Sequence, residues 1–267
     1  MNNENGYHGT EEQKKLAALK AASEIQDNMV LGLGTGSTVY YLILKLAERV
    51  RGGLHIHAAA TSARTEGLAA HYGIPLIPLH QAEQIHLAID GVDAIDPDFY
   101  SIKGGGGALF REKVIASKAM RVIWIMDQSK LVPTLNGLTL PVEVVPFATG
   151  FVEEQVRAMG FISRLRRNGD GLDGDGLDGN NPDRDDSGAS VFLTDNGNHI
   201  LDLQGKEGVD YRLMAGRLKA LTGVVETGIF GNICEKIIVG TEDGVIVKSS
   251  GNHSIPSPLI QISSCQK

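Results

Sequence analysis

The sequence has little cysteine and no long apolar run. Its 267 residues include two cysteines, Cys234 and Cys265, which lie far from any C-x-x-C spacing. Neither a disulfide framework nor a zinc cluster is therefore expected, and a reducing compartment is favoured. No apolar run approaches membrane-spanning length, and residues 1–12 are polar and lack the apolar core of a signal peptide. These absences predict a cytoplasmic protein.

Positive charge is also scarce. The chain has 25 Lys and Arg against 32 Asp and Glu, a formal net charge of −7, and no long basic run. Neither a nucleic acid nor an anionic membrane is therefore expected as a partner. A small anionic ligand is compatible with this charge, because a few local cations and backbone N–H groups decide its binding. A composition of 42% hydrophobic and 21% charged residues indicates a globular protein of one large or two modest domains.

Two neighbouring segments, 89–93 and 103–112, bring together three carboxylates, a lysine and four consecutive glycines. The short apolar stretch before Asp90 predicts a buried strand. Asp90 and Asp93 would then lie in the loop at its carboxyl end, where open α/β sheets bind ligands. The glycine run 104–107 would let backbone N–H groups approach an anion closely. The helix expected next would present its N-terminus to the same place.

Glu112 is predicted to point inward from that helix. It shares a helical face with Ala108, Ile115 and Ala119, which are apolar. Burial would raise the pKa of its carboxyl, and the nearby Lys103 or Arg111 would lower it. A carboxylate held in this balance suits proton transfer. The alternative is a glutamate favoured in the first helical turn by the helix dipole.

A second glycine-rich loop, residues 32–38, stands between a short apolar strand and an amphipathic helix. It does not match the dinucleotide fingerprint, which needs glycine where Ser37 stands, and it lacks the Gly-Lys-Ser/Thr of a Walker loop. The hydroxyls of Thr35, Ser37 and Thr38 at a helix N-terminus suit a monophosphate. Capping of the helix by Ser37 alone is the alternative.

The alternation of strands and helices up to about residue 130 predicts an α/β fold with a doubly wound, mostly parallel sheet. The expected strands are 29–31, 54–60, 74–76, 85–89 and 121–126, and the expected helices include 10–25 and 62–72. Lys130 would follow the last of these strands at its carboxyl end.

After residue 140 the pattern changes to that of a smaller inserted α+β domain. Segments 190–193 and 200–203 flank an Asn-Gly turn and predict a hairpin. Segments 237–239 and 244–247 would return to the first domain. The predicted domains are therefore 1–139 with 230–267, and an insert at 140–229.

Residues 168–189 contain the sequence DGLDG twice in succession. The Asp and Gly spacing does not follow the EF-hand calcium loop, so a flexible acidic loop is expected rather than a calcium site. The polar tail from residue 249 carries Pro256 and Pro258 and is expected to be poorly ordered.

Eight segments resemble, in order, the signatures of the type A ribose-5-phosphate isomerase family. They are residues 35–38, 61–65, 90–93, 103–107, 111–113, 141–146, 194–198 and 223–226. The resemblance covers roughly residues 14–248. It implies reversible conversion of D-ribose 5-phosphate to D-ribulose 5-phosphate in the pentose phosphate pathway. It also implies a homodimer or homotetramer that needs no metal and no organic cofactor.

The resemblance assigns a role to each candidate residue. Glu112 would move a proton between C1 and C2, Asp90 would open the sugar ring, and Asp93 would orient hydroxyls. Lys103 and the glycine backbone would stabilise the enediolate. The substrate-binding residues would be Thr35, Gly36, Ser37, Thr38, Asp90, Gly91, Val92, Asp93, Lys103, Gly104, Gly105, Gly106, Lys130 and Lys14. Ala94 stands where the family often has an acidic residue, so any role of that carboxylate is missing here.

Two other functions are compatible with a related fold. An amino-sugar-phosphate deaminase would need its own base and a histidine relay, and no histidine lies in the motifs assigned to the site. A non-catalytic sugar-phosphate sensor would keep the loop at 35–38 without needing Glu112. Such a sensor would normally carry a DNA-binding segment, which this sequence lacks.

Overall fold

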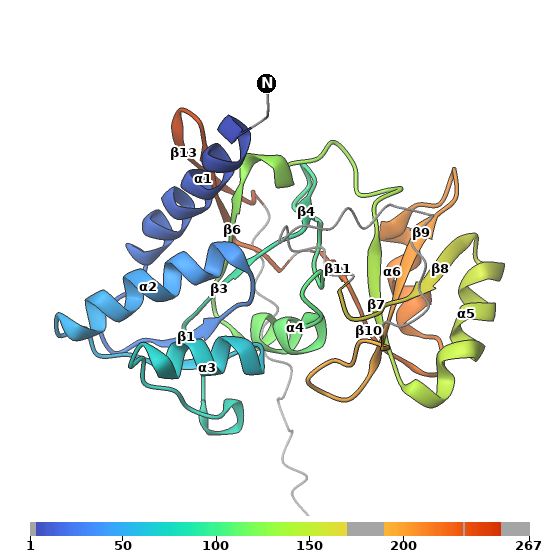
Figure 1. Ribbon diagram of the computed structural model, residues 1–267, viewed down its shortest axis with the longest axis horizontal. Coiled ribbons are helices and arrows are strands. Elements are labelled where there is room, and N and C mark those ends of the chain that lie inside the picture. The colour runs from blue at the N-terminus through green and yellow to red at the C-terminus, as the bar shows by residue number, and fades with distance from the viewer. Residues whose placement is uncertain (1–3, 170–189, 232, 252–267) are drawn as a thin grey trace, which may run out of the picture.

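The computed structural model describes residues 4–169, 190–231 and 233–251. Its largest sheet has six strands in the order β13-β12-β6-β3-β1-β2 (Figure 1). The strands from β12 to β2 are parallel, and β13 pairs antiparallel with β12 at one edge. Their bounds are β1 (Val30–Leu33), β2 (His57–Ala60), β3 (Leu87–Gly91), β6 (Val122–Asp127), β12 (Lys236–Thr241) and β13 (Gly244–Ser249). The predicted mostly parallel sheet is confirmed.

The strand order reverses at β1. From β1 the chain moves to β2 on one side and later returns to β3 on the other side. The loops that leave the carboxyl ends of β1 and β3 therefore diverge, and such a point is where open α/β sheets form a ligand crevice. The strand predicted at 74–76 is wrong, because Leu76 makes only an isolated bridge with Ala58 beside β2.

Helices cover both faces of this sheet (Figure 1). They are α1 (Glu4–Ala22), α2 (Ser37–Arg51), α3 (Ala63–His71) and α4 (Leu109–Lys118). Alternate residues of each strand point to opposite faces. Ile89 thus packs in the cluster with α1 and α2, whereas Ala88 and Trp124 pack with Ile115 of α4. Asp90 shares the parity of Ala88 and therefore faces α4.

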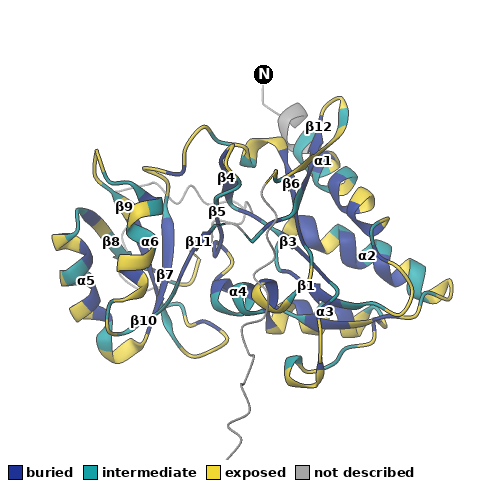
Figure 2. Ribbon diagram, turned by 180° about the vertical axis from the view of Figure 1, so that it is seen from behind, coloured by how far each residue is buried: buried dark blue, intermediate teal, exposed yellow. Residues whose placement is uncertain are grey.

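A smaller antiparallel sheet has the strand order β10-β7-β9-β8. Its elements are β7 (Leu140–Val144), β8 (Phe161–Leu165), β9 (His199–Gly205) and β10 (Val224–Thr227), with helices α5 (Thr149–Ala158) and α6 (Tyr211–Lys219). Every residue of β7 is buried (Figure 2). One face packs on α5 and α6, and the other turns toward α4 and the central loops. We propose residues 140–229 as the inserted unit, because β12 and β13 rejoin the large sheet.

Short strands and 3-10 turns connect these parts. A three-stranded sheet is formed by β4 (Ala94–Ile95), β5 (Ser101–Ile102) and β11 (Ile229–Phe230) in the order β11-β5-β4. The 3-10 turns are Leu79–Gln81, Gln128–Lys130 and Pro146–Ala148. Because β11 pairs with β5, the end of the smaller unit is tied to the segment just before Lys103.

The predicted hairpin between 190–193 and 200–203 is wrong. The backbone of 190–192 pairs with 166–168, which lies between it and β9. The turn itself is present, since Thr194 N–H donates to Asn198 O at 2.9 Å. It is held by buried Glu143, whose Oε1 accepts from the Thr194 hydroxyl and from the amides of Asn196 and Asn198. Those bonds fold the turn over β7 instead of extending a hairpin.

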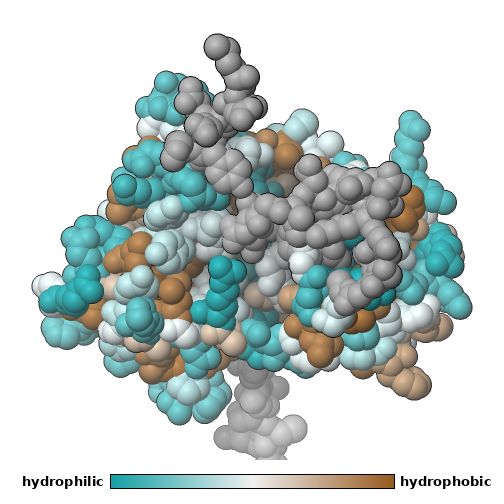
Figure 3. All heavy atoms as spheres, in the orientation of Figure 1, coloured by the Kyte–Doolittle hydropathy of each residue, from teal (hydrophilic) through white to brown (hydrophobic). Residues whose placement is uncertain are grey.

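Some predictions fall beyond the described residues. The acidic repeat lies wholly within 170–189, and most of the C-terminal tail lies within 252–267. Across the described ranges, none of the helices is both long and apolar enough to cross a membrane. Where the face in Figure 3 is not drawn in grey, hydrophilic residues surround separate patches of hydrophobic ones.

Candidate active site

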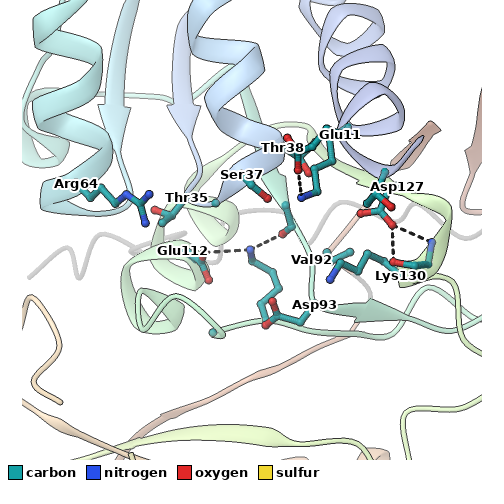
Figure 4. A pocket seen from close by; sticks show the side chains of 17 residues that line it. Glu11, Thr35, Ser37, Thr38, Arg64, Val92, Asp93, Glu112, Asp127 and Lys130 are labelled. Carbon is teal, nitrogen blue, oxygen red and sulfur yellow. Dashed lines mark hydrogen bonds and ion pairs between the residues drawn. The ribbon is translucent and has the colours of Figure 1, made fainter. Parts of the chain in front are cut away.

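A cavity of about 300 Å³ lies at the carboxyl ends of β1, β3 and β6 (Figure 4). Most of the predicted site residues line it. They are Lys14, Thr35, Gly36, Ser37, Thr38, Gly91, Val92, Asp93, Lys103, Gly104, Glu112 and Lys130. The cavity lining does not include Asp90, Gly105 or Gly106, and Asp90 lies buried directly beneath it.

Lys103 is the centre of the buried charges. Its side chain is 2% exposed, and its Nζ lies 3.1 Å from Asp90 Oδ2 and 3.2 Å from Glu112 Oε1. The same Nζ donates to Gly91 O at 2.6 Å and lies 5.3 Å from the centre of the Trp124 ring. Burial acts to lower the pKa of Lys103, but the carboxylates of Asp90 and Glu112 outweigh it and raise that pKa above its ordinary value. The site therefore holds a permanent cation between two carboxyl groups.

Asp90 lies within β3, not in the loop that the sequence predicted, because β3 extends to Gly91. Its Oδ1 accepts from the N–H of Thr35 at 2.9 Å and of Gly91 at 2.7 Å. A Cβ on Gly34 would lie 2.0 Å from this oxygen, so the β1 loop needs glycine there. Burial raises the pKa of Asp90, and Lys103 is the main influence against it. Asp90 thus joins the two diverging loops and presents its other oxygen to Lys103.

Glu112 points inward from the first turn of α4, as predicted, and is 5% exposed. Its Oε1 meets Lys103, while Oε2 is buried and has no hydrogen-bond partner in the described part of the chain. Burial raises the pKa of Glu112 to about 8, although Lys103 acts to lower it, and Asp90 and Asp93 add to the rise. A buried carboxyl group can accept and return a proton when one of its oxygens has no hydrogen-bond partner and its pKa is near neutrality.

The glycine run forms a tight turn against the smaller unit. Gly104 has φ +107, and a Cβ there would lie 2.7 Å from Leu109 Cδ2. The N–H of Gly105 donates to Asp93 Oδ2 at 2.8 Å. The N–H of Lys103 donates to Gly228 O at 2.9 Å. Side chains would prevent this close packing, which brings the Gly104 backbone to the cavity wall.

The N-terminus of α2 opens on the same cavity. Its N-cap is Gly36, with no side-chain capping bond, so the alternative of a cap formed by Ser37 is wrong. Thr35 behaves differently from the prediction, since its hydroxyl bonds with those of Thr61, Ser62 and Thr65 at 2.8–3.1 Å. That network anchors the loop and leaves the backbone N–H groups of the first helical turn available for an anion.

The two predicted phosphate lysines flank this helix end. Lys14 Nζ lies 2.6 Å from Glu11 Oε1, and Glu11 Oε2 accepts from the Tyr41 hydroxyl. Lys130 ends the 3-10 turn after β6 and lines the cavity. Within the described residues it has no hydrogen-bond or ion-pair partner. Lys130 is therefore free to meet an anionic ligand.

Arg64 and Asp127 also line the cavity and were not anticipated. Asp127 is the last residue of β6, and Asp90 likewise lies near the end of β3. Its Oδ1 accepts from Ser129, and its buried Oδ2 has no partner in the described chain. Position after a strand could have indicated Asp127, and Arg64 lies within 61–65, one of the segments that resemble the family signatures. Among the residues that the structure describes, no three His, Cys, Asp or Glu side chains are grouped so as to hold a metal ion.

Comparison with known proteins points to one family. The family model of ribose 5-phosphate isomerase A (phosphoriboisomerase A) matches residues 57–244. The chain is 42% identical to ribose-5-phosphate isomerase A of Sphingopyxis alaskensis over 239 residues, which is 90% of this chain and 96% of that protein. It is also 42% identical to the Listeria monocytogenes protein of that name over 234 residues, covering 88% and 96% of the two chains.

Solved structures agree with these sequence matches. The chain is similar to ribose 5 phosphate isomerase A from Neisseria gonorrhoeae, with TM-score 0.78, 32% identity, and 91% and 98% of the two chains covered. For the Plasmodium falciparum ribose 5-phosphate isomerase the TM-score is 0.79 at 34% identity, with 91% and 100% covered. A D-ribose-5-phosphate isomerase in complex with phospho-erythronic acid has TM-score 0.79 at 36% identity, covering 90% and 99%.

Proposed function

The chain belongs to the ribose 5-phosphate isomerase A family, and we propose that the cavity between β1, β3 and α4 is its active site. The activity is that of an aldose–ketose isomerase, which interconverts D-ribose 5-phosphate and D-ribulose 5-phosphate in the pentose phosphate pathway. One observation carries the assignment of the site. A buried ammonium, Lys103, lies 3.1 and 3.2 Å from two carboxyl groups, and a helix N-terminus opens at the other end of the same cavity.

The reaction needs a base that reaches both C1 and C2. Glu112 takes the proton from C2 of the open-chain aldose through Oε2, the oxygen that has no hydrogen-bond partner in the described chain. It then delivers a proton to C1 of the resulting enediolate. The hydroxyl proton of O2 is transferred to O1 in the same conversion, so the ketose forms with no net change in protons. Asp90 serves ring opening, and Asp93 orients a hydroxyl.

The enediolate carries negative charge on oxygens near C1 and C2. Lys103 stabilises this charge, because its ammonium stays protonated between Asp90 and Glu112 and needs no rearrangement during the reaction. The backbone N–H groups of the glycine run add dipoles whose positive ends also favour this negative charge. The phosphate would bind at the N-terminus of α2, where Ser37, Thr38, Lys130 and Lys14 line the cavity. The substrate would then lie extended across the cavity from Lys130 to Glu112 (Figure 4).

Neither alternative function is favoured by the cavity. A deaminase needs a histidine relay, and no histidine of the described chain lines this cavity. A sensor has no use for an inward carboxyl with a raised pKa beside a buried lysine. Incubation of the pure protein with ribose 5-phosphate tests the assignment. Formation of ribulose 5-phosphate supports it, and binding without ketose formation would favour the sensor.

The relative in complex with phospho-erythronic acid shows that a member of the family binds a phosphorylated sugar acid. For this chain the proposal is a sugar-phosphate ligand, a cytoplasmic location, and assembly as a homodimer or homotetramer. Light scattering coupled to size exclusion measures the assembly directly. A monomer under the conditions of the activity assay would contradict that part of the proposal.

Replacing Lys130 by alanine should weaken the binding of ribose 5-phosphate about 10- to 100-fold, because a hydrogen bond to a charged group contributes about 1.5–3 kcal/mol. Turnover should change only a few-fold, since Lys130 lies away from the proton-transfer groups. Binding of unphosphorylated ribose should not change. Affinities measured by calorimetry, with exposed Lys118→Ala as the control, test this. An equal loss for both sugars would show that Lys130 does not contact the phosphate.

The raised pKa of Glu112 predicts an acid limb in the pH profile. The base must be deprotonated in the free enzyme, so kcat/KM should rise about tenfold per pH unit below 8 and level off above it. The measurement is kcat/KM for ribose 5-phosphate across this range. A profile that is already flat two units below 8 would contradict the raised pKa.

The same pKa affects stability. The folded-state pKa of about 8 lies above 4.5, the ordinary glutamate value, so between these values only the folded state keeps the proton. Stability from this group is fully present below 4.5 and is lost as the pH rises through about 8. Glu112→Gln should therefore gain stability over wild type as the pH rises, by a few kcal/mol at most, since one pKa unit is about 1.4 kcal/mol. Urea unfolding at acid and alkaline pH tests the sign.

A further inference from the structure

One buried arginine links the smaller sheet to the glycine run of the active site. Arg166, which follows β8, is 1% exposed. Its Nε and Nη2 donate to the carboxylate of Asp202 on β9 at 2.9 and 2.5 Å. Its Nη1 donates to Gly104 O at 2.8 Å and to Gly105 O at 2.9 Å. The guanidinium thus joins a carboxylate of one unit to two peptide carbonyls of the other.

Those two contacts set the direction of two peptide planes. In a trans peptide the C=O and the following N–H point in opposite directions. With Gly104 O held by Arg166, the N–H of Gly105 points the other way, and it donates to Asp93 Oδ2 at 2.8 Å. With Gly105 O held in the same way, the N–H of Gly106 also faces away from Arg166. Glycines have no side chain to hold such an orientation, so it depends on partners like this one.

Packing alone does not account for the buried ion pair between Arg166 and Asp202. A charged group buried to this extent carries a desolvation penalty of several kcal/mol that its partners must offset, and an apolar pair of similar volume is often as stable or more so. The planar fork of arginine can meet a carboxylate with two N–H groups and still direct a third to the carbonyls, which a lysine cannot do. The Phe192 ring, 5.9 Å from the guanidinium carbon, helps to confine it.

We propose that Arg166, fixed by Asp202, is a positioning residue for the isomerase reaction: it holds the Gly104 and Gly105 carbonyls, so that the Gly105 N–H keeps the carboxylate of Asp93 aligned in the cavity that holds the substrate. The smaller unit thereby contributes to catalysis without contacting the substrate. This inference rests on the proposed roles of the glycine backbone and Asp93.

Three variants test it: Arg166→Lys, Arg166→Met and Asp202→Asn. Arg157→Met is the matched control, because Arg157 is an exposed arginine on α5 of the same unit. For folded Arg166 variants, kcat for ribose 5-phosphate should fall about 10- to 100-fold with KM within about threefold, below the loss of about 10²–10³ seen when an oxyanion donor is removed outright. Asp202→Asn should also lower kcat with little change in KM, but the fall in kcat should be smaller. The Arg157→Met control should match wild type.

Inhibitor binding separates positioning from a general loss of structure. Phospho-erythronate has a planar carboxylate next to its hydroxyl-bearing carbons and so resembles the charge of the enediolate, whereas inorganic phosphate occupies only the phosphate end. Arg166→Lys should bind phospho-erythronate about 10-fold or more weakly and inorganic phosphate as wild type does. If Arg166→Met does not fold, Arg166→Lys and Asp202→Asn decide the question.

Two outcomes would overturn the positioning role. One is a folded Arg166→Lys variant with wild-type kcat and phospho-erythronate affinity. The other is a loss confined to KM, or an equal loss of affinity for phosphate and phospho-erythronate. Failure of the proposed function itself would look different, because wild type and Arg157→Met would then also produce no ribulose 5-phosphate.

Discussion

Glu112→Gln is expected to lower kcat for ribose 5-phosphate by at least about 10²-fold, the usual effect of a positioned general base. Binding of the substrate should stay within a few-fold. Glutamine preserves the shape of the side chain and can still accept a hydrogen bond from Lys103, but it cannot take up the C2 proton. The buried oxygen of Glu112 that has no partner in the described chain is the atom whose chemistry the change removes. Steady-state kinetics combined with substrate calorimetry measures both quantities.

Glu66 supplies a matched control for this variant. It is the fourth residue of α3, as Glu112 is of α4, but it is exposed. If Glu112 only complemented a helix dipole, Glu66→Gln and Glu112→Gln would both cost a few tenths of a kcal/mol in stability and little activity. A Glu112→Gln variant with more than about a tenth of the wild-type kcat would show that Glu112 is not the base.

Lys103→Met is the second change with a large expected effect. The methionine keeps most of the apolar stem but removes the cation that lies 3.1 Å from Asp90 and 3.2 Å from Glu112. The enediolate then loses its main counter-charge, and kcat should fall about 10²–10³-fold. Removing one member of a buried ion pair also destabilises the fold, by about 3–5 kcal/mol. The carboxyls should respond by holding their protons more tightly, which moves the acid limb of kcat/KM to higher pH.

Lys113 offers the comparison for that experiment. It lies on α4, the helix of Glu112, and its Nζ donates to Glu226 and to the carbonyls of Thr227 and Ile229. It lies outside the cavity lining. Lys113→Met should therefore lose stability while its kcat stays within a few-fold of wild type. If Lys103→Met also lost only stability, the electrostatic role of Lys103 would be wrong.

Local patterns predicted much of the site. The helical period placed Glu112 on an apolar face, and the structure buries it there. The glycine-rich segment at 32–38 sits at the N-terminus of α2, as its composition suggested. The order of strands and helices indicated a doubly wound sheet, which brings the loops after β1 and β3 together. Each of these features depends on residues close in sequence or on a general rule of sheet topology.

Long-range pairing explains what the sequence did not reveal. Arg166 meets Gly104 across 62 residues of sequence, and no periodicity marks such a contact. The hairpin at 190–203 was mispredicted because Glu143, about fifty residues earlier, captures the turn. Thr35 was expected to face a phosphate, but hydroxyls at 61–65 occupy its side chain. Tertiary partners override local preference in each case.

Proton exchange in heavy water tests the assignment of Glu112 most directly. An enediolate formed by a carboxylate base exchanges its proton with solvent, so wild-type protein acting on ribose 5-phosphate should yield ribulose 5-phosphate with deuterium on C1, visible by NMR. Glu112→Gln, still able to bind the sugar phosphate, should give neither ketose nor carbon-bound deuterium. Deuterium incorporation or ketose formation by Glu112→Gln at the wild-type rate would contradict proton transfer by Glu112.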